Sequence, residues 1–248
     1  MSAVTTVNTT HAPLASAVRR LGILVVHNDP VPEAEIWRAA PAGVEIVTGR
    51  FQLHREPGQE YVGEKVDTFL TPAVRRTIAD LIDAGADALA LGFVSASVFG
   101  GPEFDTAFTA EVPVPAFTAG QALRHRIDEL APARPLLVAP PWFTDDTIAA
   151  AKTYLGLDPQ TATRRFDLGP EWATGARQDL FDRGAKNHVP DTALRDQILA
   201  AATPATDAVV IPGSGFRTLA AAADVTRSLG IPVISANSAV LEYYLSTW

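Results

Sequence analysis

The chain of 248 residues contains no cysteine. This absence excludes disulfide bonds, thiolate metal sites and thiol nucleophiles. A chain of this length can bury a substantial core without covalent cross-links, as one large domain or two smaller ones. Stability must therefore come from packing, and any catalysis must rely on side chains other than cysteine.

The sequence also lacks a long hydrophobic run. No apolar stretch approaches the ~20 residues that span a bilayer, and the run at 21–26 is far too short. Residues 1–18 are rich in Ser, Thr and Ala and lack the basic start and apolar segment of a secretory signal. We therefore expect a flexible tail over 1–18, no membrane partner and a cytoplasmic protein.

Clustered positive charge is missing as well. The formal net charge is −8, and no run of Lys and Arg could neutralise several phosphates, so nucleic acid is not an expected partner. His11, His54 and His125 show no ligand spacing, so we expect no metal site. The segment Gly213-Ser-Gly-Phe lacks the glycine spacing and the lysine of a phosphate-binding loop, and we expect no cofactor.

What the sequence does contain is an alternation of short apolar runs with segments of helical period. This pattern is typical of parallel strands joined by crossover helices. The expected strands lie at 21–26, 44–47, 88–91, 136–139, 208–211 and 233–235, and the expected helices at 71–84, 119–130, 145–155, 190–201, 216–229 and 237–245.

An internal repeat organises these elements. The segment that begins at Asp87 matches the one that begins at Asp207, about 120 positions later. A second match sets Val112 beside Ile231, and a third, looser one sets residues 21–29 beside 135–144. Three strand ends in the same order at nearly constant spacing indicate duplication. We predict an α/β fold of two Rossmann-like parallel-sheet halves related by a pseudo-twofold axis.

The two halves are expected to interleave, with 19–118 plus about 232–248 in the first and 119–231 in the second. In an open parallel sheet, ligands bind beyond the carboxyl ends of the strands. Two such sheets that face each other would share one cleft, and we expect the site there. The loops that would reach it lie at 27–30, 93–97, 117–120, 140–144, 213–215 and 236–238.

Serines in these loops indicate an anion site. Ser95, Ser97 and Ser214 follow buried strands, where the N–H groups of a helix start can bind a carboxylate or the enediolate formed from it. The same serines can equally act as helix caps and nothing more. The sequence leaves both readings open.

His27 is the candidate acid or base. It follows the first expected strand, at a place from which a side chain can enter the cleft, and imidazole titrates near neutral pH. The alternative is a hydrogen-bonded loop histidine. The polar stretch 169–190, which includes Lys186, has two readings, a segment that lines or covers the cleft and a solvated loop, and we predict the solvated loop.

With these residues in view, the chain resembles the aspartate/glutamate racemase superfamily, nearest the branch of maleate isomerase, arylmalonate decarboxylase and the ectoine-utilisation protein EutA. The resemblance covers about residues 20–246. It implies two Rossmann-like halves and a substrate carboxylate bound by the loops after the Asp87 and Asp207 strands. Because relatives commonly form dimers or tetramers, it also implies a homo-oligomer. It is carried by 21–26, 87–97, 207–219 and 230–237.

This sequence departs from the family pattern at the reacting groups. The proton transfers of the family use one or two cysteines in the same two loops, and the matching positions here are about 93–95 and 213. A tyrosine that often helps to hold the carboxylate is replaced by Phe143 or Trp142. The resemblance therefore implies a cysteine-less member without the usual proton machinery.

Two functions are compatible with such a site. The first is a cofactor-independent isomerase or lyase, such as a decarboxylase, that acts on a small carboxylic acid or carbonyl compound through an enolate-like intermediate held by backbone N–H groups. The second is a catalytically inactive racemase-like protein that binds a small metabolite or a partner. For the enzyme, the candidate catalytic residues are His27, Ser95 and Ser214, and the candidate substrate-binding residues are Asn28, Tyr61, Phe93, Val94, Ser97, Trp142, Phe143, Gly213, Gly215 and Asn237.

Overall fold

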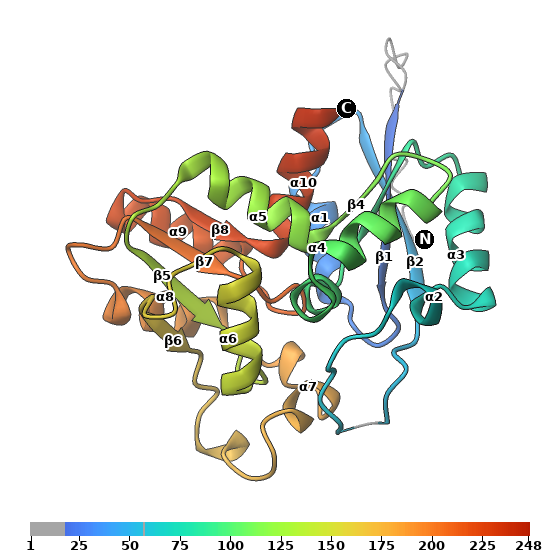
Figure 1. Ribbon diagram of the computed structural model, residues 1–248. Helices are drawn as coiled ribbons and strands as arrows, with labels where there is room; N and C mark the ends of the chain where they lie inside the picture. Colours follow the sequence, from blue (N-terminus) through green and yellow to red (C-terminus); the bar gives the residue numbers. More distant parts are fainter. Residues whose placement is uncertain (1–17, 57) are drawn as a thin grey trace, which may run out of the picture.

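The computed structural model describes residues 18–56 and 58–248. The tail expected over 1–18 and His11 therefore lie, but for residue 18, outside the described residues. Within them, eight strands form two four-stranded parallel sheets with the orders β2-β1-β3-β4 and β6-β5-β7-β8. The predicted fold class is thus confirmed. Figure 1 shows the two sheets with helices packed between and around them.

The elements of the first sheet are β1 (Arg19–Val26), α1 (Val31–Ala39), β2 (Val44–Phe51), α2 (Val66–Phe69), α3 (Pro72–Asp83), β3 (Ala88–Leu91), α4 (Val94–Glu111) and β4 (Ala116–Thr118). Those that follow are α5 (Ala119–Leu130), β5 (Pro135–Ala139), α6 (Asp145–Tyr154), β6 (Thr163–Arg165), α7 (Asp179–Asp182), α8 (Asp191–Ala201), β7 (Ala208–Ile211), α9 (Leu219–Leu229), β8 (Val233–Ser235) and α10 (Ala236–Thr247). Among the described residues, no helix is long and apolar enough to cross a membrane.

The apolar strands are buried on both faces, as expected of a parallel sheet covered by helices. Because successive side chains point to opposite faces, Leu21 and Ile23 of β1 join the core between the two sheets, whereas Leu24 joins a core under α3. The same alternation separates Leu137 from Leu136 in β5. Continuous apolar runs in the sequence therefore read as strands with two buried faces.

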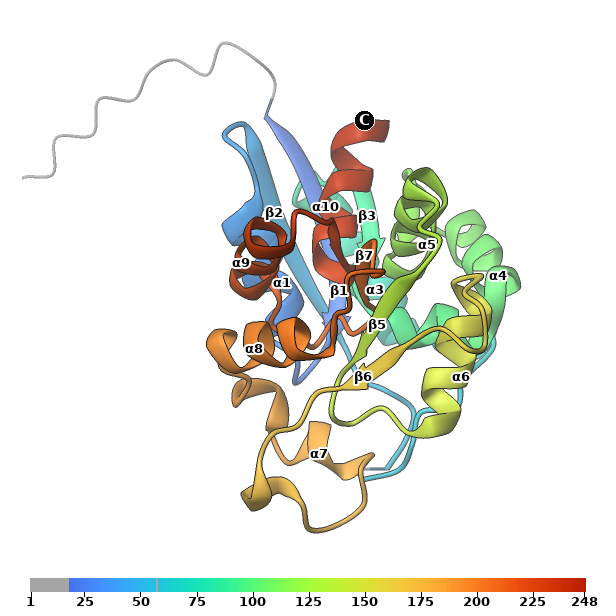
Figure 2. The ribbon, with the colours of Figure 1, turned by 90° about the vertical axis from the view of Figure 1, so that its left-hand side faces the viewer.

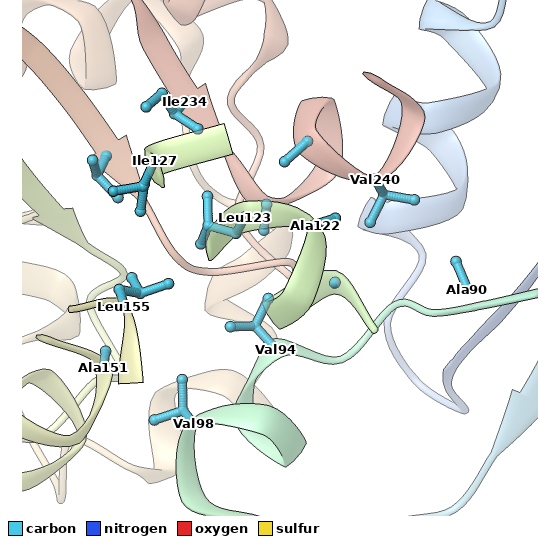
Figure 3. Close-up of a cluster of buried hydrophobic side chains, with 14 of the residues drawn as sticks. Ala90, Val94, Val98, Ala122, Leu123, Ile127, Ala151, Leu155, Ile234 and Val240 are labelled. Carbon is cyan, nitrogen blue, oxygen red and sulfur yellow. The ribbon is translucent and has the colours of Figure 1, made fainter. Parts of the chain in front are cut away.

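The core between the sheets joins the two halves. Figure 3 shows Val94 and Val98 of α4 facing a group that includes Leu123 of α5, Leu155 of α6 and Val240 of α10. These helices come from the middle and the C-terminal end of the chain, and burying their apolar faces together is a large favourable contribution to folding. The two sheets are consequently parts of one packed body.

The duplication is visible in the equal strand orders of the two sheets, with a correction to one sequence match. Ala116 pairs with Leu89 in the first sheet as Val233 pairs with Val209 in the second, so the counterpart of Ile231 is Val114 and not Val112. Residues 233–235, grouped from sequence with the first half, pair with β7 in the second sheet.

All six predicted strands are present, and several elements were not predicted. The short edge strands β4 and β6 are missing from the sequence prediction, as are α1 and α4. Residues 94–97, expected in a loop, form the first turn of α4, whose kink at Gly101 and internal Pro102 hide its helical pattern. The helix expected from 216 begins at Leu219. The predicted helix start at Thr71 is confirmed, because its side chain accepts a hydrogen bond from the N–H of Val74.

A buried polar cluster ties α4 to α6 across the junction of the halves. The carboxylate of Asp105 accepts hydrogen bonds from Ser97 Oγ at 2.6 Å, from Thr118 Oγ1 at 2.8 Å and from Tyr154 OH at 2.6 Å. Ser97 and Thr118 are fully buried, so these hydroxyls have no access to water. The cluster is favourable only while Asp105 remains as the shared acceptor.

We expect Asp105→Ala to destabilise the protein by about 3 kcal/mol, because a buried hydroxyl left without an acceptor costs about 1–3 kcal/mol. Urea unfolding followed by circular dichroism measures the change. The control is Asp128→Ala, which removes an exposed carboxylate from α5. Equal stability of the two variants would contradict the role given to Asp105.

Candidate functional site

A cavity of about 80 Å³ opens at the carboxyl ends of the four inner strands, two from each sheet. Strand ends of this kind are the usual ligand sites of parallel α/β sheets. Four of the six predicted loops contribute to it, whereas 117–120 and 236–238 do not. The cavity is lined by Asp29, Leu53, Arg55, Gln59, Glu60, Tyr61, Phe93, Val94, Ser95, Phe99, Trp142, Phe143, Thr147, Gln178, Phe181, Pro212, Gly213, Ser214 and Gly215.

Aromatic rings form two walls of the cavity. On the side of the first sheet, the ring of Tyr61 packs edge-on against Phe93, with centroids 5.0 Å apart. On the side of the second sheet, Trp142 packs edge-on against Phe181 at 5.4 Å. Such walls accept an apolar group and lower the local dielectric constant, which strengthens the polar interactions inside.

A segment after β2, described over residues 52–56 and 58–65, covers the cavity, and we name it the roof loop. It belongs to the first sheet but is fastened to the second. Arg55 forms a two-pronged ion pair with Asp182 of α7, with N–O distances of 2.7 and 3.0 Å, and the N–H of Gly58 donates to the same carboxylate. Glu60 accepts hydrogen bonds from Thr144 and Thr147 at the start of α6. Figures 1 and 2 show the roof loop beside α7.

The loop after β7 supplies unused hydrogen-bond donors. Within the described residues, the N–H groups of Gly213, Ser214 and Gly215 donate to no protein atom. The hydroxyls of Ser214 and Ser95, which also line the cavity, likewise have no protein partner there. Helix α4 begins at the opposite wall, and the first N–H groups of a helix have no acceptor within it. The cavity is therefore rich in donors that can bind an anion.

Glu35 of α1 fixes the loop after β7 from the other sheet. Its buried carboxylate accepts hydrogen bonds from the N–H of Thr218 at 2.6 Å, from the N–H of Leu219 at 2.9 Å and from Asn237 Nδ2 at 2.8 Å. The same Asn237 amide also donates to the backbone oxygen of Ser214 at 2.9 Å. The donors at 213–215 are thus held in place by contacts between the halves.

Asp29 is the titratable group that stands out in the cavity. Its side chain is only 3% exposed, Oδ1 accepts a hydrogen bond from the N–H of Val31 at 3.0 Å, and Oδ2 has no hydrogen-bond partner among the described residues. Burial raises its pKa from 3.8 to about 6, against the lowering effects of the Val31 hydrogen bond and of Lys186 and Arg50. A carboxyl group with such a pKa can exchange a proton near neutral pH.

The structure brings most of the sequence-predicted site residues to one place. Tyr61, Phe93, Val94, Ser95, Trp142, Phe143, Gly213, Ser214 and Gly215 all line the cavity. Neither Ser95 nor Ser214 makes a helix-capping hydrogen bond, since α4 has no side-chain cap and Thr218 is the cap residue of α9. Capping alone therefore does not account for these serines.

Four predicted site residues do not line the cavity. His27 is exposed, and what faces the cavity from its loop is Asp29, two positions later. Asn28 is half-buried beside it, and its Oδ1 lacks a hydrogen-bond partner in the described part of the chain. Ser97 and Asn237 are buried in the polar clusters of Asp105 and Glu35, so both support the walls from behind.

Sequence reasoning missed Asp29 and Lys186, and of the roof-loop residues that line the cavity it selected Tyr61 alone. Asp29 lies in the same loop as His27, just after a predicted strand, so its position was a usable signal. An aspartate titrates near neutral pH only when it is buried, however, and the sequence does not show that burial. Lys186, placed from sequence in a solvated loop, is instead 4% exposed, which corrects that expectation. No sequence pattern shows that the stretch 169–190 folds back onto the cavity. No group of three or more potential metal ligands occurs within residues 18–56 and 58–248.

Comparison with known proteins identifies the fold. No protein-family model matches the sequence, and no curated protein matches it. Among solved structures, a variant of arylmalonate decarboxylase in its sulfate-associated form has a TM-score of 0.68 and 22% identity over 92% of each chain. Maleate isomerase Iso from Pseudomonas putida with maleate has a TM-score of 0.68 and 19% identity over 92% of this chain and 91% of its own. The chain has the fold of these two enzymes.

A third neighbour of the same kind is the Nocardia farcinica maleate cis-trans isomerase with a covalently bound succinylcysteine intermediate. Its TM-score is 0.67 and its identity 16%, over 92% of this chain and 91% of its own. At identities this low, the likeness to arylmalonate decarboxylase and maleate isomerase establishes the fold alone. What the site does must be argued from its own residues.

The raised pKa of Asp29 makes a prediction about stability. The folded state binds the Asp29 proton more tightly than the unfolded state, so the stability of the wild type falls as the pH rises from 3.8 to about 6. Asp29→Asn keeps an acceptor for Val31 and removes the ionisation. We expect this variant to match the wild type near pH 4 and to exceed it near pH 8 by up to about 3 kcal/mol, because one pKa unit corresponds to about 1.4 kcal/mol. Urea unfolding at both pH values measures the difference, and a variant destabilised equally at both would contradict it.

Proposed function

We propose that the chain is an enzyme, a cofactor-independent lyase or isomerase that moves a proton on a small carboxylic acid without a thiol. One observation carries the proposal: a buried carboxyl group with a pKa of about 6, Asp29, lines the same cavity as the unused donors at Gly213, Ser214 and Gly215. Proton exchange and anion binding are the two tasks that such a reaction needs. A protein that only binds a metabolite has no use for an acid with a shifted pKa, so the inactive alternative is less favoured.

The substrate carboxylate would bind to the N–H groups at 213–215, with the hydroxyls of Ser214 and Ser95 as further donors. When a bond beside this carboxylate breaks, the electron pair moves onto it and forms an enediolate with more negative charge. Donors that are already oriented stabilise this charge more than the ground state, which lowers the barrier. The aromatic walls of Phe93 and Trp142 would hold an apolar substituent of the substrate.

Asp29 would act as the acid. A bound carboxylate beside Asp29 adds a like charge and raises the pKa of Asp29 further, so the occupied site holds Asp29 protonated at neutral pH. In a decarboxylation, the bond between the α-carbon and the leaving carboxyl breaks, carbon dioxide departs and the pair remains as the enediolate. The proton on Asp29 then moves to the α-carbon, and Asp29 regains a proton from water.

The lack of cysteine favours reactions without a covalent enzyme intermediate. One structural neighbour carries a succinylcysteine intermediate, which this chain cannot form because it has no thiol. Decarboxylation requires an anion site, an apolar pocket and one acid. In this cavity, the N–H groups at 213–215, the aromatic walls and Asp29 would supply them. We therefore place decarboxylation of a substituted malonate first and proton-transfer isomerisation second.

Reactions run in D₂O with arylmalonates, alkylmalonates and maleate test the proposal, with products followed by ¹H NMR. Decarboxylation leaves one deuterium on the α-carbon, and isomerisation of maleate yields fumarate. Turnover of any of these acids by the wild type, and its loss in Ser214→Pro, which removes one donor N–H, supports the assignment. Binding of several acids with no reaction of any would instead support the metabolite-binding alternative.

We expect Asp29→Asn to lower kcat/KM by about 10²–10⁴-fold, the usual contribution of a general acid. Because the acid form must be present, wild-type kcat/KM should fall as the pH rises through about 6. The control is Asp128→Asn on α5, which should keep both the rate and the pH profile. A profile that rises with pH would make Asp29 a base, and loss of activity in His27→Ala would return the proton transfer to His27.

A further inference from the structure

We propose that Lys186 is the charge partner of Asp29, a positioning residue whose buried ammonium group stabilises the Asp29 carboxylate once its proton has left. The proposal rests on the proposed function, in which Asp29 is the acid. Lys186 does not line the cavity and does not touch the substrate site. It would act on the reaction through Asp29 alone.

Burial of the Lys186 ammonium group costs free energy, because the charge loses its contact with water. It follows α7 in a short 3₁₀ turn, Ala185–Asn187, and its side chain is 4% exposed. Its Nζ donates to the backbone oxygen of Phe181 at 2.8 Å and sits 4.0 Å from the centre of the Phe181 ring. Both contacts fix the ammonium group, but neither supplies a negative charge to offset its burial.

A chain of contacts links Lys186 to Asp29 through Phe181 and Gly215. A Cβ atom placed on Gly215 would lie 2.6 Å from Asp29 Oδ2 and 2.9 Å from the Phe181 ring, so Gly215 fits tightly between the two. Lys186 lies on the same ring. The lysine and the carboxyl group are thus buried in the same region, beside Phe181 and Gly215, with little water to screen their charges.

The other charges around this pair already cancel. Asp182, which faces Lys186, is held by Arg55 in a two-pronged ion pair. Arg50, which faces Asp29, is paired with Glu33 of α1. Among the charged groups that act on Asp29 and Lys186, these two pairs leave Asp29 and Lys186 to face each other.

The direction of each pKa agrees with this arrangement. Burial lowers the pKa of Lys186, and the facing Asp29 and Asp182 oppose that effect. Burial raises the pKa of Asp29, and Lys186 is the strongest of the charges that pull it down again. Without Lys186, Asp29 would keep its proton to higher pH, because the charge that stabilises its carboxylate would be gone.

The test measures Asp29 directly and without substrate. In protein labelled with ¹³C at aspartate carboxyls, the resonance that disappears in Asp29→Asn identifies Asp29, and its shift against pH gives the pKa. We expect Lys186→Met, which retains packing on Phe181, to raise this pKa by about one unit, a tenfold change in proton affinity. Lys186→Arg, which keeps the charge, should raise it less.

The matched control is Lys152→Met. Lys152 also donates to backbone oxygens, those of Pro159 and Thr161, at 2.9 and 2.8 Å, but it lies on α6 outside the cavity. This variant should leave the pKa of Asp29 where it is. An unchanged or lowered pKa of Asp29 in Lys186→Met would overturn the proposal. If that variant does not fold, Lys186→Gln also removes the charge and should raise the pKa of Asp29 in the same way.

Turnover separates this proposal from the proposed function. If the chain is the enzyme we infer, the pH at which kcat/KM falls should rise in Lys186→Met by as many pH units as the pKa of Asp29 rises in the NMR titration. An NMR shift with no turnover of any acid by the wild type would keep the charge pair and remove the enzyme. Turnover with an unaltered pH profile and an unaltered Asp29 titration would keep the enzyme and remove the charge pair.

Discussion

Two buried carboxylates that cross between the sheets hold this molecule together at its site. Glu35 lies on α1 of the first half and accepts a hydrogen bond from the N–H of Thr218, next to α9 of the second half. Asp105 lies on α4 of the first half and accepts a hydrogen bond from the hydroxyl of Tyr154 on α6 of the second half. The two contacts occupy corresponding places in the duplicated halves, since α1 and α6 each follow the first strand of their sheet. Because each carboxylate serves at least three donors, a shift of one half against the other would leave several buried groups without a partner. The facing strand ends are therefore fixed to each other as firmly as they are to their own sheets.

On this fixed frame, an unusual proton chemistry becomes possible. A chain without cysteine needs another group that titrates near neutral pH, and burial converts an ordinary aspartate into one. The cost is a charged state that is poorly solvated, and the stability of the fold therefore depends on the protonation of Asp29. In the proposed reaction, both stability and activity are highest when Asp29 is protonated, and both fall as the proton is lost.

The features that could be predicted from the sequence are those that leave a pattern in a short stretch of it. The inner strands were predictable because their apolar runs are long enough to be recognised, and the repeat fixed their order. The edge strands β4 and β6 were not, since each has three residues and neither stands out as an apolar run, whereas the equally short β8 was found through the repeat. Eight cavity residues were predicted because they follow inner strands, and Tyr61 was predicted in the loop after the edge strand β2. Asp29 and Lys186 were missed because their importance comes from burial by segments distant in sequence, and the loops around 52–65 and 169–190 have no pattern that reveals where they pack.

The fastening of the roof loop has a consequence for how a solute gets in. The roof loop follows β2 of the first sheet, whereas the residues that bind it belong to the second half, Asp182 on α7 and Thr144 and Thr147 at the start of α6. Burial opposes the ionisation of Asp182, yet the hydrogen bonds from Arg55 and Gly58 keep its pKa below its usual range, so the anchor survives mild acid. Among the described residues, the segment is therefore bonded to both halves of the molecule. It cannot lift away from the cavity without breaking these bonds, so a solute that enters past it must first disrupt them.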